Sequence, residues 1–309
     1  MRVLVTGGGG FVGSHLVERL LARGDDPFVA RRRDYDLTTW DGAEQVFADA
    51  RPELVFHLAA EVGGIGANRA NPGRYWYANL MMGANVLEAA REHATGKVVV
   101  AGTVCAYPKF TPVPFREDDL WNGYPEETNA PYGLAKKMML VLSDAYRRQY
   151  GFDSVVPILA NLYGPEDNFD LEDSHVIAAM IRKFVEAHDR DDEPVTLWGT
   201  GSASREFLYV DDAARALLLA AEHLDRSEAV NVGTGVETRI RDLAETIRDL
   251  VGHRGEVDWD ASKPDGQPTR YLDVTRAREW MGFEATTPLR EGLARTIQSF
   301  REHHAMAAS

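Results

Sequence analysis

The first half of the chain alternates short apolar runs with stretches whose apolar residues recur at helical spacing. The apolar runs are typical of buried strands, and they cover residues 3–6, 27–30, 54–58, 97–101 and 154–158. The helical spacing predicts helices over residues 11–23, 42–50, 75–93 and 132–150. Because strands and helices alternate, the pattern predicts right-handed βαβ units and a doubly wound parallel sheet with helices on both faces.

The pattern is looser after residue 164, where Pro- and Gly-rich pieces such as residues 263–268 separate the elements. Helices are expected over residues 176–188, 211–224, 240–251 and 289–303, and short strands over residues 195–198, 207–210 and 256–259. We therefore expect a large α/β domain over residues 1–163, with a returning segment at about residues 204–234. A smaller, mixed α/β substrate-binding domain is expected over residues 164–309.

A glycine-rich loop lies directly between the first strand and the first helix, over residues 6–13. Glycines at this spacing allow a tight turn and bring backbone N–H groups close to a pyrophosphate, at the positive end of a helix. The strand–loop–helix order favours a Rossmann-type dinucleotide site over a glycine-rich turn without a ligand. The loop residues expected to contact the cofactor are Gly7, Gly10, Phe11, Val12 and Gly13.

The end of the second strand indicates which dinucleotide binds. An acidic residue there would hold the ribose 2′-hydroxyl of NAD, but this chain has Arg31 and Arg32, which suit the 2′-phosphate of NADP. A solvated basic turn is the alternative. Further residues are expected to flank the adenine or to line the middle of the cofactor: Asp36, Leu37, Leu58, Ala59 and Ala60.

Tyr132 and Lys136 lie four residues apart, on one face of a predicted helix. We expect Lys136 to lower the pKa of the phenol and to bind the nicotinamide ribose, while Tyr132 acts as acid or base at the reacting oxygen. Thr103, at the end of the fourth strand, is the expected third member, and Asn79 is a candidate supporting and cofactor-contacting residue. This set resembles the triad of extended short-chain dehydrogenases/reductases, which implies hydride transfer at a carbon–oxygen bond.

Charge and cysteine content exclude other classes. The net charge of −14 argues against nucleic-acid or anionic-membrane partners. Neither a signal sequence nor a membrane-spanning run is evident, so a cytoplasmic protein is expected. Cys105 is the only cysteine, which excludes an internal disulfide and a thiolate zinc site, and no metal is expected.

Longer strings give a narrower resemblance over essentially the whole chain. They include residues 61–65, 105–109, 161–165, 167–169, 174–177, 198–201, 205–207 and 260–266. These strings are similar to those of GDP-L-fucose synthases, which epimerise C3 and C5 of GDP-4-keto-6-deoxy-D-mannose and reduce C4 with NADPH. The resemblance also implies a homodimer that pairs the helices over residues 75–93 and 132–150.

The resemblance assigns further roles. Cys105 and His175 occupy the family's acid/base positions, where a thiol and an imidazole exchange protons next to the C4 ketone. His175 and Asn161 are also expected at the cofactor. Expected substrate contacts are Val62, Gly63, Gly64, Lys183, Trp198, Arg205 and Arg270, with the cations at the diphosphate and the indole at the guanine or sugar.

The sequence also departs from the family. Thr103 stands where serine is usual, Gly9 where an arginine can contact the cofactor, and Glu166 where histidine is common. Leu159 and Ala160 replace proline and threonine, while Lys183 and Arg270 stand where arginine and lysine are usual.

These departures keep two alternatives open. A reductase or epimerase that acts on a related nucleotide-4-keto sugar has the same scaffold, but it does not need both Cys105 and His175. A catalytically dead dinucleotide sensor would not need Tyr132 and Lys136.

Overall fold

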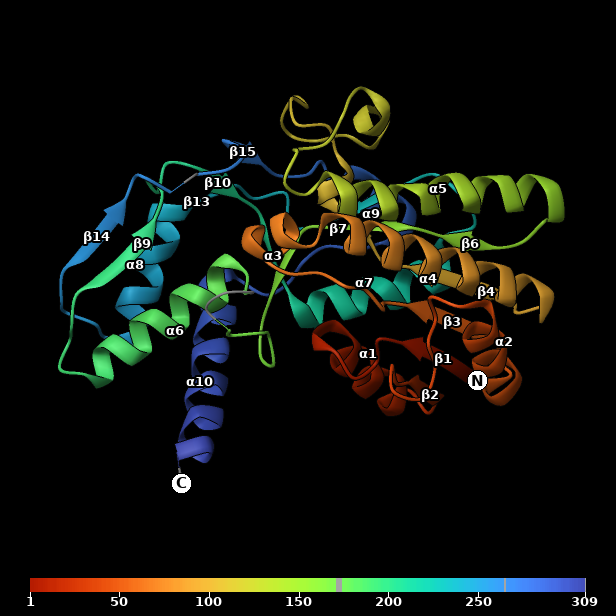
Figure 1. The fold of residues 1–309 in the computed structure, drawn as a ribbon, viewed down its shortest axis with the longest axis horizontal. Coiled ribbons are helices and arrows are strands. Elements are labelled where there is room, and N and C mark those ends of the chain that lie inside the picture. Colours follow the sequence, from red (N-terminus) through yellow and green to blue (C-terminus); the bar gives the residue numbers. More distant parts are fainter. Residues whose placement is uncertain (171–173, 264, 309) are drawn as a thin grey trace.

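A computed structural model of the protein describes residues 1–170, 174–263 and 265–308. Its N-terminal half forms a twisted sheet between two layers of helices, and most elements after residue 175 gather at one end of the molecule (Figure 1). None of the helices in this described part of the chain combines the length and the apolar character needed to span a membrane.

The central sheet is parallel, as predicted. Five strands pair in the order β2-β1-β3-β4-β6, and they are β1 (Arg2–Thr6), β2 (Asp26–Ala30), β3 (Leu54–His57), β4 (Lys97–Val100) and β6 (Ser154–Val155). One residue beyond β4 and one beyond β6, the chain continues as β5 (Gly102–Thr103) and β7 (Pro157–Leu159), and β7 also pairs with β12 (Val230–Val232). The predicted strand over residues 154–158 is thus interrupted at Val156.

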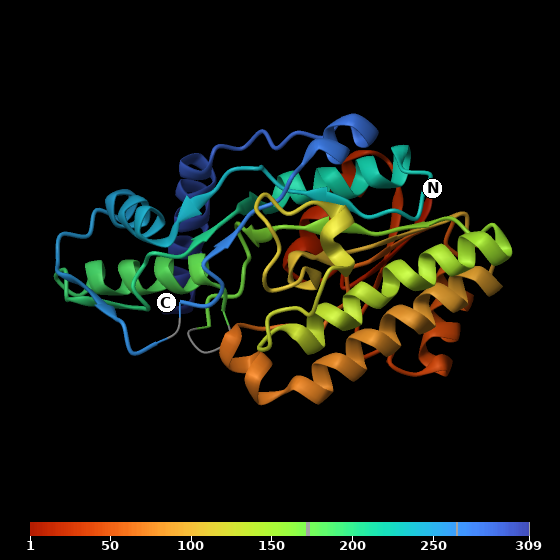
Figure 2. The same ribbon diagram turned by 90° about the horizontal axis from the view of Figure 1, so that it is seen from above.

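Helices cover both faces of the sheet. Figure 2 shows α4 (Pro72–Glu92) and α5 (Ala130–Tyr150) along one face and α7 (Val210–His223) along the other. The helix α1 (Phe11–Ala22) packs against α7, and α2 (Trp40–Ala50) packs against α4. The predicted α/β, doubly wound Rossmann-type fold is confirmed.

Buried apolar residues form two cores. The first takes residues from the parallel sheet and its helices and, later in the chain, from residues 208–232 and 272–283. The second joins α6 (Val176–Asp189), α8 (Ile240–Val251) and α10 (Leu289–Ala308) to β9 (Val195–Trp198). The chain therefore passes between the cores more than once, and the segment at residues 272–283, with α9 (Thr275–Met281), was not expected in the first.

Short strands connect the two cores. They pair as β8 (Asn161–Tyr163) with β11 (Phe207–Tyr209), β9 with β14 (Val257–Asp260), and β10 (Ser204–Arg205) with both β13 (Thr238–Arg239) and β15 (Thr269–Arg270). The sequence analysis did not anticipate β8, β12, β10, β13 or β15, or the helix α3 (Ile65–Ala70). These elements span two to six residues, too few to display a hydrophobic period.

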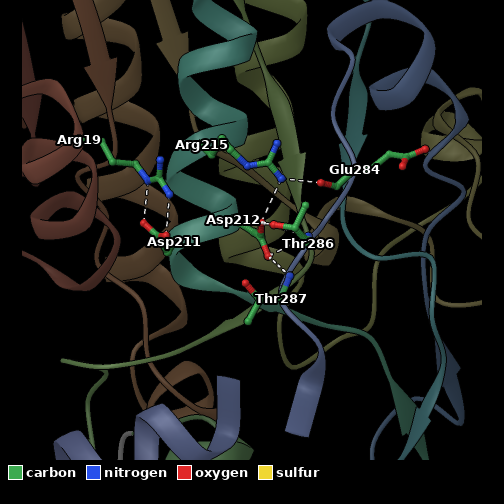
Figure 3. Close-up of polar contacts among 7 residues, drawn as sticks. All are labelled: Arg19, Asp211, Asp212, Arg215, Glu284, Thr286 and Thr287. Carbon is green, nitrogen blue, oxygen red and sulfur yellow. Dashed lines mark hydrogen bonds and ion pairs between the residues drawn. The ribbon is translucent and has the colours of Figure 1, made fainter. Parts of the chain in front are cut away.

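The N-terminus of α7 fastens the segment that leads into α10 (Figure 3). Asp212 is 3% exposed and accepts hydrogen bonds from the Thr286 hydroxyl and the Thr287 N–H, both at 2.9 Å, and from Arg215 at 3.0 Å. Although burial raises the pKa of Asp212, the hydrogen bonds from Arg215 and Thr287 hold it below its usual value. The neighbouring Asp211 makes two contacts of 2.6 Å with Arg19 on α1.

Candidate active site

A cleft of about 830 Å³ lies between the two cores, at the carboxyl ends of β1, β3, β5 and β7. Ligands bind at this edge in open α/β sheets. Nearly all the site residues predicted from the sequence line the cleft, and the exceptions are Arg31 and Asn79. The lining set comprises Gly7, Gly10, Phe11, Val12, Gly13, Arg32, Asp36, Leu37, Leu58, Ala59, Ala60, Val62, Gly63, Gly64, Thr103, Cys105, Tyr132, Lys136, Asn161, His175, Lys183, Trp198, Arg205 and Arg270.

The glycine loop is shaped by contacts that exclude side chains. Gly7 has a φ of +72°, and a Cβ there would lie 2.7 Å from the backbone nitrogen of Ala59. A Cβ on Gly13 would lie 2.1 Å from the Gly7 carbonyl oxygen. Gly10 precedes α1 and provides no side-chain cap, so the start of this helix is open for an anion.

Of the two arginines predicted to contact the cofactor, Arg31 and Arg32, only Arg32 lines the cleft. Arg31 is exposed and lies outside the lining set. The Arg32 Nη2 lies 2.8 Å from Glu61 Oε1, a contact that the sequence analysis did not expect. Close by, Asp36 accepts hydrogen bonds from Thr38, which lower the pKa of its carboxyl.

Asn79 lies behind the cleft. It is 1% exposed, so it is not a helix-surface amide, and its side chain bonds the N–H and the carbonyl of Glu61 at 3.1 Å and 2.8 Å. Its amide also donates to the Tyr75 carbonyl at 2.7 Å. Asn79 therefore holds the loop after β3, and any effect on a cofactor passes through that loop.

Thr103 and Tyr132 meet because α5 packs closely on the turn after β5. A Cβ on Gly133 would lie 2.2 Å from the Cys105 carbonyl oxygen, so only glycine allows this approach. Burial, and then the nearby Cys105, raise the pKa of the Tyr132 phenol, while a hydrogen bond with Thr103 lowers it. Lys136 is not among the groups that shift this pKa, so the expected lowering of the phenol pKa by Lys136 is not found, and burial keeps the pKa raised.

The ammonium group of Lys136 is almost completely buried from solvent. The residue is 4% exposed, and burial lowers the pKa of its ammonium group to about 8. Among the described residues, no hydrogen-bond or ion-pair partner is found for this group, which lines the cleft. The pKa of the buried His57 is well below its usual value, first because of burial and second because of the nearby charge of Lys136. A bound ligand with hydroxyl oxygens would satisfy such an ammonium group.

The two predicted proton-exchange residues come from different cores. Cys105 lies in the 3-10 turn η1 (Val104–Ala106), where its N–H donates to Thr103 Oγ1 at 3.2 Å. Its Sγ lies 3.7 Å from Arg270 Nη1. His175 precedes α6 and faces the same cleft from the second core, where burial lowers the pKa of its imidazole below 6.5.

Arg205 and Arg270 form a cationic pair at one wall of the cleft. Arg205 donates to the carbonyls of Ser204 and Gln267 at 2.6 Å, and Arg270 donates twice to Gln267 Oε1, at 3.2 Å and 3.0 Å. Burial, and then the charge of Arg270, lower the pKa of Arg205 to about 10. Within the described part of the chain, neither guanidinium has a carboxylate at ion-pair distance, so the pair retains charge for an anion.

Trp198 projects into the cleft beside two ammonium groups. Its indole is 62% exposed, and the Nζ atoms of Lys183 and Lys263 lie 5.9 Å and 5.3 Å from the ring centroid. Lys183 also donates to the Thr196 carbonyl at 2.8 Å. An exposed aromatic face with fixed cations is suited to a planar base or a sugar.

The remaining predicted contacts belong to loops held by amides. Asn68 donates to the Gly63 carbonyl at 2.7 Å and the Gly64 carbonyl at 3.0 Å, while Asn161 donates to the Glu206 carbonyl at 2.9 Å. Polar lining residues that the sequence analysis did not single out include Glu61, Asn68, Glu126, Asp265 and Gln267. Two of them, Glu61 and Asp265, lie within strings that carried the family resemblance, and that was the signal available.

One residue of those strings, Pro264, lies outside the described residues. Among the residues that are described, no group of three or more His, Cys, Asp or Glu side chains could hold a metal ion.

Comparison with known proteins gives a consistent result. Residues 3–233 match the NAD dependent epimerase/dehydratase family. The chain is 42% identical to the probable GDP-L-fucose synthase 1 of Oryza sativa subsp. japonica, covering 98% of this chain and 92% of that protein. It is also 42% identical to the GDP-L-fucose synthase of Escherichia coli strain K12, with 98% and 97% covered. Identity to the GDP-L-colitose synthase of Yersinia pseudotuberculosis is 31%, with 97% and 98% covered.

Solved structures are similar over the same length. A GDP-L-fucose synthetase from Naegleria fowleri bound to NADP has a TM-score of 0.88 at 29% identity, with 99% of this chain and 94% of that chain covered. A GDP-6-OMe-4-keto-L-xylo-heptose reductase from C. jejuni has a TM-score of 0.91 at 26% identity, with 97% of each chain covered. The predicted resemblance to GDP-L-fucose synthases is confirmed.

Proposed function

The chain belongs to the NAD dependent epimerase/dehydratase family, and we propose that it converts GDP-4-keto-6-deoxy-D-mannose to GDP-L-fucose with NADPH. The observation that carries this proposal is that Cys105 and His175 face the same cleft as Thr103, Tyr132 and Lys136. A plain 4-ketoreductase would not need the first two residues. The 42% identity to GDP-L-fucose synthases over nearly the whole chain supports the same assignment.

The residues fit the cofactor. Backbone contacts at Gly7 and Gly13 leave no room for side chains, α1 begins there without a cap, and the Lys136 ammonium lacks a partner among the described residues. Pyrophosphate and ribose hydroxyl groups would satisfy these sites. Arg32 supports NADP, because its guanidinium lines the cleft and can pair with a 2′-phosphate.

Epimerisation uses the acidity that the C4 ketone confers on C3 and C5. One of Cys105 and His175 removes the proton from the carbon, and the other returns a proton to the opposite face, so each centre inverts without net redox change. Because the pKa of His175 is lowered, its imidazole is mostly neutral at pH 7 and can accept a proton. The two groups come from different cores, which suits delivery to opposite faces of a sugar.

Reduction follows at C4. When bound, NADPH supplies the hydride to this carbon. Thr103 holds the C4 oxygen and Tyr132 donates its phenolic proton to that oxygen. Because the pKa of its phenol is raised, Tyr132 is protonated at neutral pH and is available as the proton donor. Lys136 binds the nicotinamide ribose.

The GDP portion would lie along the second core. Arg205 and Arg270 carry unneutralised charge for the diphosphate, and Lys183 adds a third cation beside Trp198. The decisive experiment is incubation with GDP-4-keto-6-deoxy-D-mannose and NADPH, with identification of the product sugar by NMR. GDP-L-fucose is expected; a reduced but unepimerised sugar would contradict the proposal.

A related GDP-4-keto sugar is the second candidate substrate. It is supported by the similarity to the colitose synthase and the heptose reductase, and by Lys183 and Arg270 at positions where the family usually has arginine and lysine. Parallel assays with such sugars separate the two, because kcat/KM ranks the substrates directly.

A homodimer through α4 and α5 is part of the proposal. Both helices expose large apolar side chains: Trp76, Tyr77, Val141 and Tyr150. Light scattering should give twice the chain mass, and Tyr77→Glu should shift it toward the monomer. The cytoplasmic location stays a prediction.

A further inference from the structure

The Glu61 carboxylate is shared by two arginines at the edge of the cleft. Arg74 contacts both carboxylate oxygens, with Nε at 2.6 Å from Oε2 and Nη2 at 3.2 Å from Oε1. Arg32 makes one contact, Nη2 to Oε1 at 2.8 Å, and its side chain is 77% exposed. Bidentate pairs are stronger than single contacts, so Glu61 holds Arg74 more firmly than Arg32.

The backbone of Glu61 is held independently of these arginines. Its N–H and carbonyl are both bonded to the buried side chain of Asn79. Its own side chain is 13% exposed, and Arg74 and Arg32 keep the pKa of the carboxyl below its usual value. A charged carboxylate therefore stays at the cleft edge whichever arginine it pairs with.

We propose that Glu61 is a cofactor-selectivity residue that competes with the 2′-phosphate of NADP for Arg32. This inference rests on the proposed binding of NADP. A dinucleotide without the phosphate leaves the Arg32–Glu61 pair in place. NADP takes Arg32 from Glu61, and Glu61 keeps Arg74. Glu61 therefore weakens NADP binding and leaves NAD binding unchanged. The difference between the affinities for NADP and for NAD becomes smaller as a result.

The phosphate wins this competition. It carries more charge than a carboxylate and can accept two hydrogen bonds from one guanidinium, whereas an exposed ion pair adds at most about fivefold to an equilibrium constant. The preference for NADP is therefore reduced and not reversed.

The main test is a double-mutant cycle in cofactor binding. Dissociation constants of NADPH and NADH are measured for the wild type, Glu61→Gln, Arg32→Met and the double variant. We expect Glu61→Gln to bind NADPH about three- to fivefold more tightly and NADH within about twofold of the wild type. In the Arg32→Met background, Glu61→Gln should change NADPH binding by less than about twofold.

Two further variants separate competition from a general charge effect. Glu18→Gln removes the same charge from an exposed position on α1 outside the cleft lining, and it should leave both constants unchanged. Arg74→Gln leaves Glu61 to Arg32 alone, so NADPH should bind several-fold more weakly. That loss should vanish in the Glu61→Gln background.

Equal tightening of NADPH by Glu61→Gln with and without Arg32 would overturn the inference, since Glu61 would then act by general repulsion. An unchanged NADPH constant in Glu61→Gln would overturn it as well. Wild-type protein that binds neither dinucleotide would instead remove the proposed function, and with it the basis of this inference.

Discussion

Arg205 and Arg270 are register partners on two parallel strands, so their guanidinium groups leave the backbone side by side at one wall of the cleft. Like charges so placed repel each other, and the described structure offers only carbonyl, amide and thiol partners to them. An anionic ligand between them is the arrangement that this geometry favours.

Arg205→Met should weaken GDP binding. A charge-assisted hydrogen bond contributes about 1.5–3 kcal/mol, which corresponds to roughly ten- to 150-fold in the dissociation constant of GDP. NADPH affinity should be unchanged, and titration calorimetry with both ligands measures this. The matched control is Arg290→Met, because Arg290 is an exposed partner of Asp249 outside the cleft lining. Equal GDP affinity in both variants would mean that the diphosphate binds elsewhere.

Tyr132→Phe should remove the acid for the C4 oxygen. A general acid typically contributes 10²–10⁴-fold, so kcat should fall by about this factor, with the dissociation constant of NADPH within about twofold of the wild type. Single-turnover oxidation of NADPH, followed by absorbance, reports the step. A variant that retains more than about a tenth of the wild-type kcat would assign the acid to another residue.

Cys105→Ser should suppress proton exchange on the sugar. Wild-type enzyme without NADPH should incorporate solvent deuterium at C3 and C5, because the ketone alone acidifies these hydrogens. A hydroxyl ionises far less readily than a thiol, so the variant should exchange at least about tenfold more slowly. NMR of the sugar distinguishes the two positions. His175→Asn is the companion variant, and it should block reprotonation.

The outcomes of this experiment separate the enzyme classes. Both variants should still bind NADPH, and reduction of the unepimerised ketone remains possible because Thr103, Tyr132 and Lys136 are intact. If Cys105→Ser exchanges deuterium at C3 and C5 as fast as the wild type, Cys105 has only a packing role. Absence of exchange in the wild type would indicate a simple 4-ketoreductase.

Lys136→Met should stabilise the ligand-free protein at neutral pH while it abolishes activity. Burial lowers the pKa of Lys136 from 10.5 to about 8, so below pH 8 the folded state bears the full cost of a buried charge. Each unit corresponds to about 1.4 kcal/mol, which gives a gain of about 1–3 kcal/mol for the variant.

The pH dependence provides the check. Between pH 8 and 10.5 the unfolded wild type binds more protons at Lys136 than the folded one, so the contribution of this residue to stability rises with pH. The advantage of Lys136→Met in urea unfolding should therefore shrink from pH 7 to pH 10. An advantage that does not change with pH would indicate that packing, and not charge, is responsible.

Asp212→Asn should destabilise the joint between α7 and the segment before α10. Asp212 is buried and accepts four or more hydrogen bonds, so its loss should cost about 2–4 kcal/mol of unfolding free energy. Asp211→Asn is the matched control, because the Asp211–Arg19 pair is partly exposed and should contribute less than about 1 kcal/mol.

The sign of the pH effect also follows. The pKa of Asp212 is lowered in the folded protein, so its stabilising contribution is present above its unfolded pKa and is lost as the pH falls through the folded value. The wild type should therefore lose more stability than Asp212→Asn between pH 5 and pH 3.

The sequence predicted those parts of the protein that local physics dictates. The glycine loop and Tyr132–Lys136 are close in sequence, so their spacing already defines their chemistry. The contacts that distant segments make across the cleft could be predicted from the sequence only in part. Cys105 and His175 were paired by resemblance alone, since 70 residues and a change of core separate them (175 − 105).

Charge partners were the least predictable feature. The segment after β2 predicted arginines available to a phosphate, but Arg32 pairs with Glu61, which lies in the loop after β3. Likewise, the pKa of Tyr132 depends on burial by η1 and the cleft walls, which no spacing of residues 132 and 136 reveals. Ion-pair partners and pKa shifts of this kind can be predicted only when the tertiary contacts are known.

The first core also constrains how the protein can be made. Strand β12 pairs with β7, and the buried residues of this core extend to Phe283, so the core needs the chain up to residue 283. During translation, this core therefore remains incomplete until residue 283 has been added. Until β12 has been synthesised, β7 lacks this pairing partner. We therefore expect that the glycine loop and the strands around it are synthesised before the core that supports them is complete. Cofactor capture by the nascent chain should therefore require synthesis past residue 283.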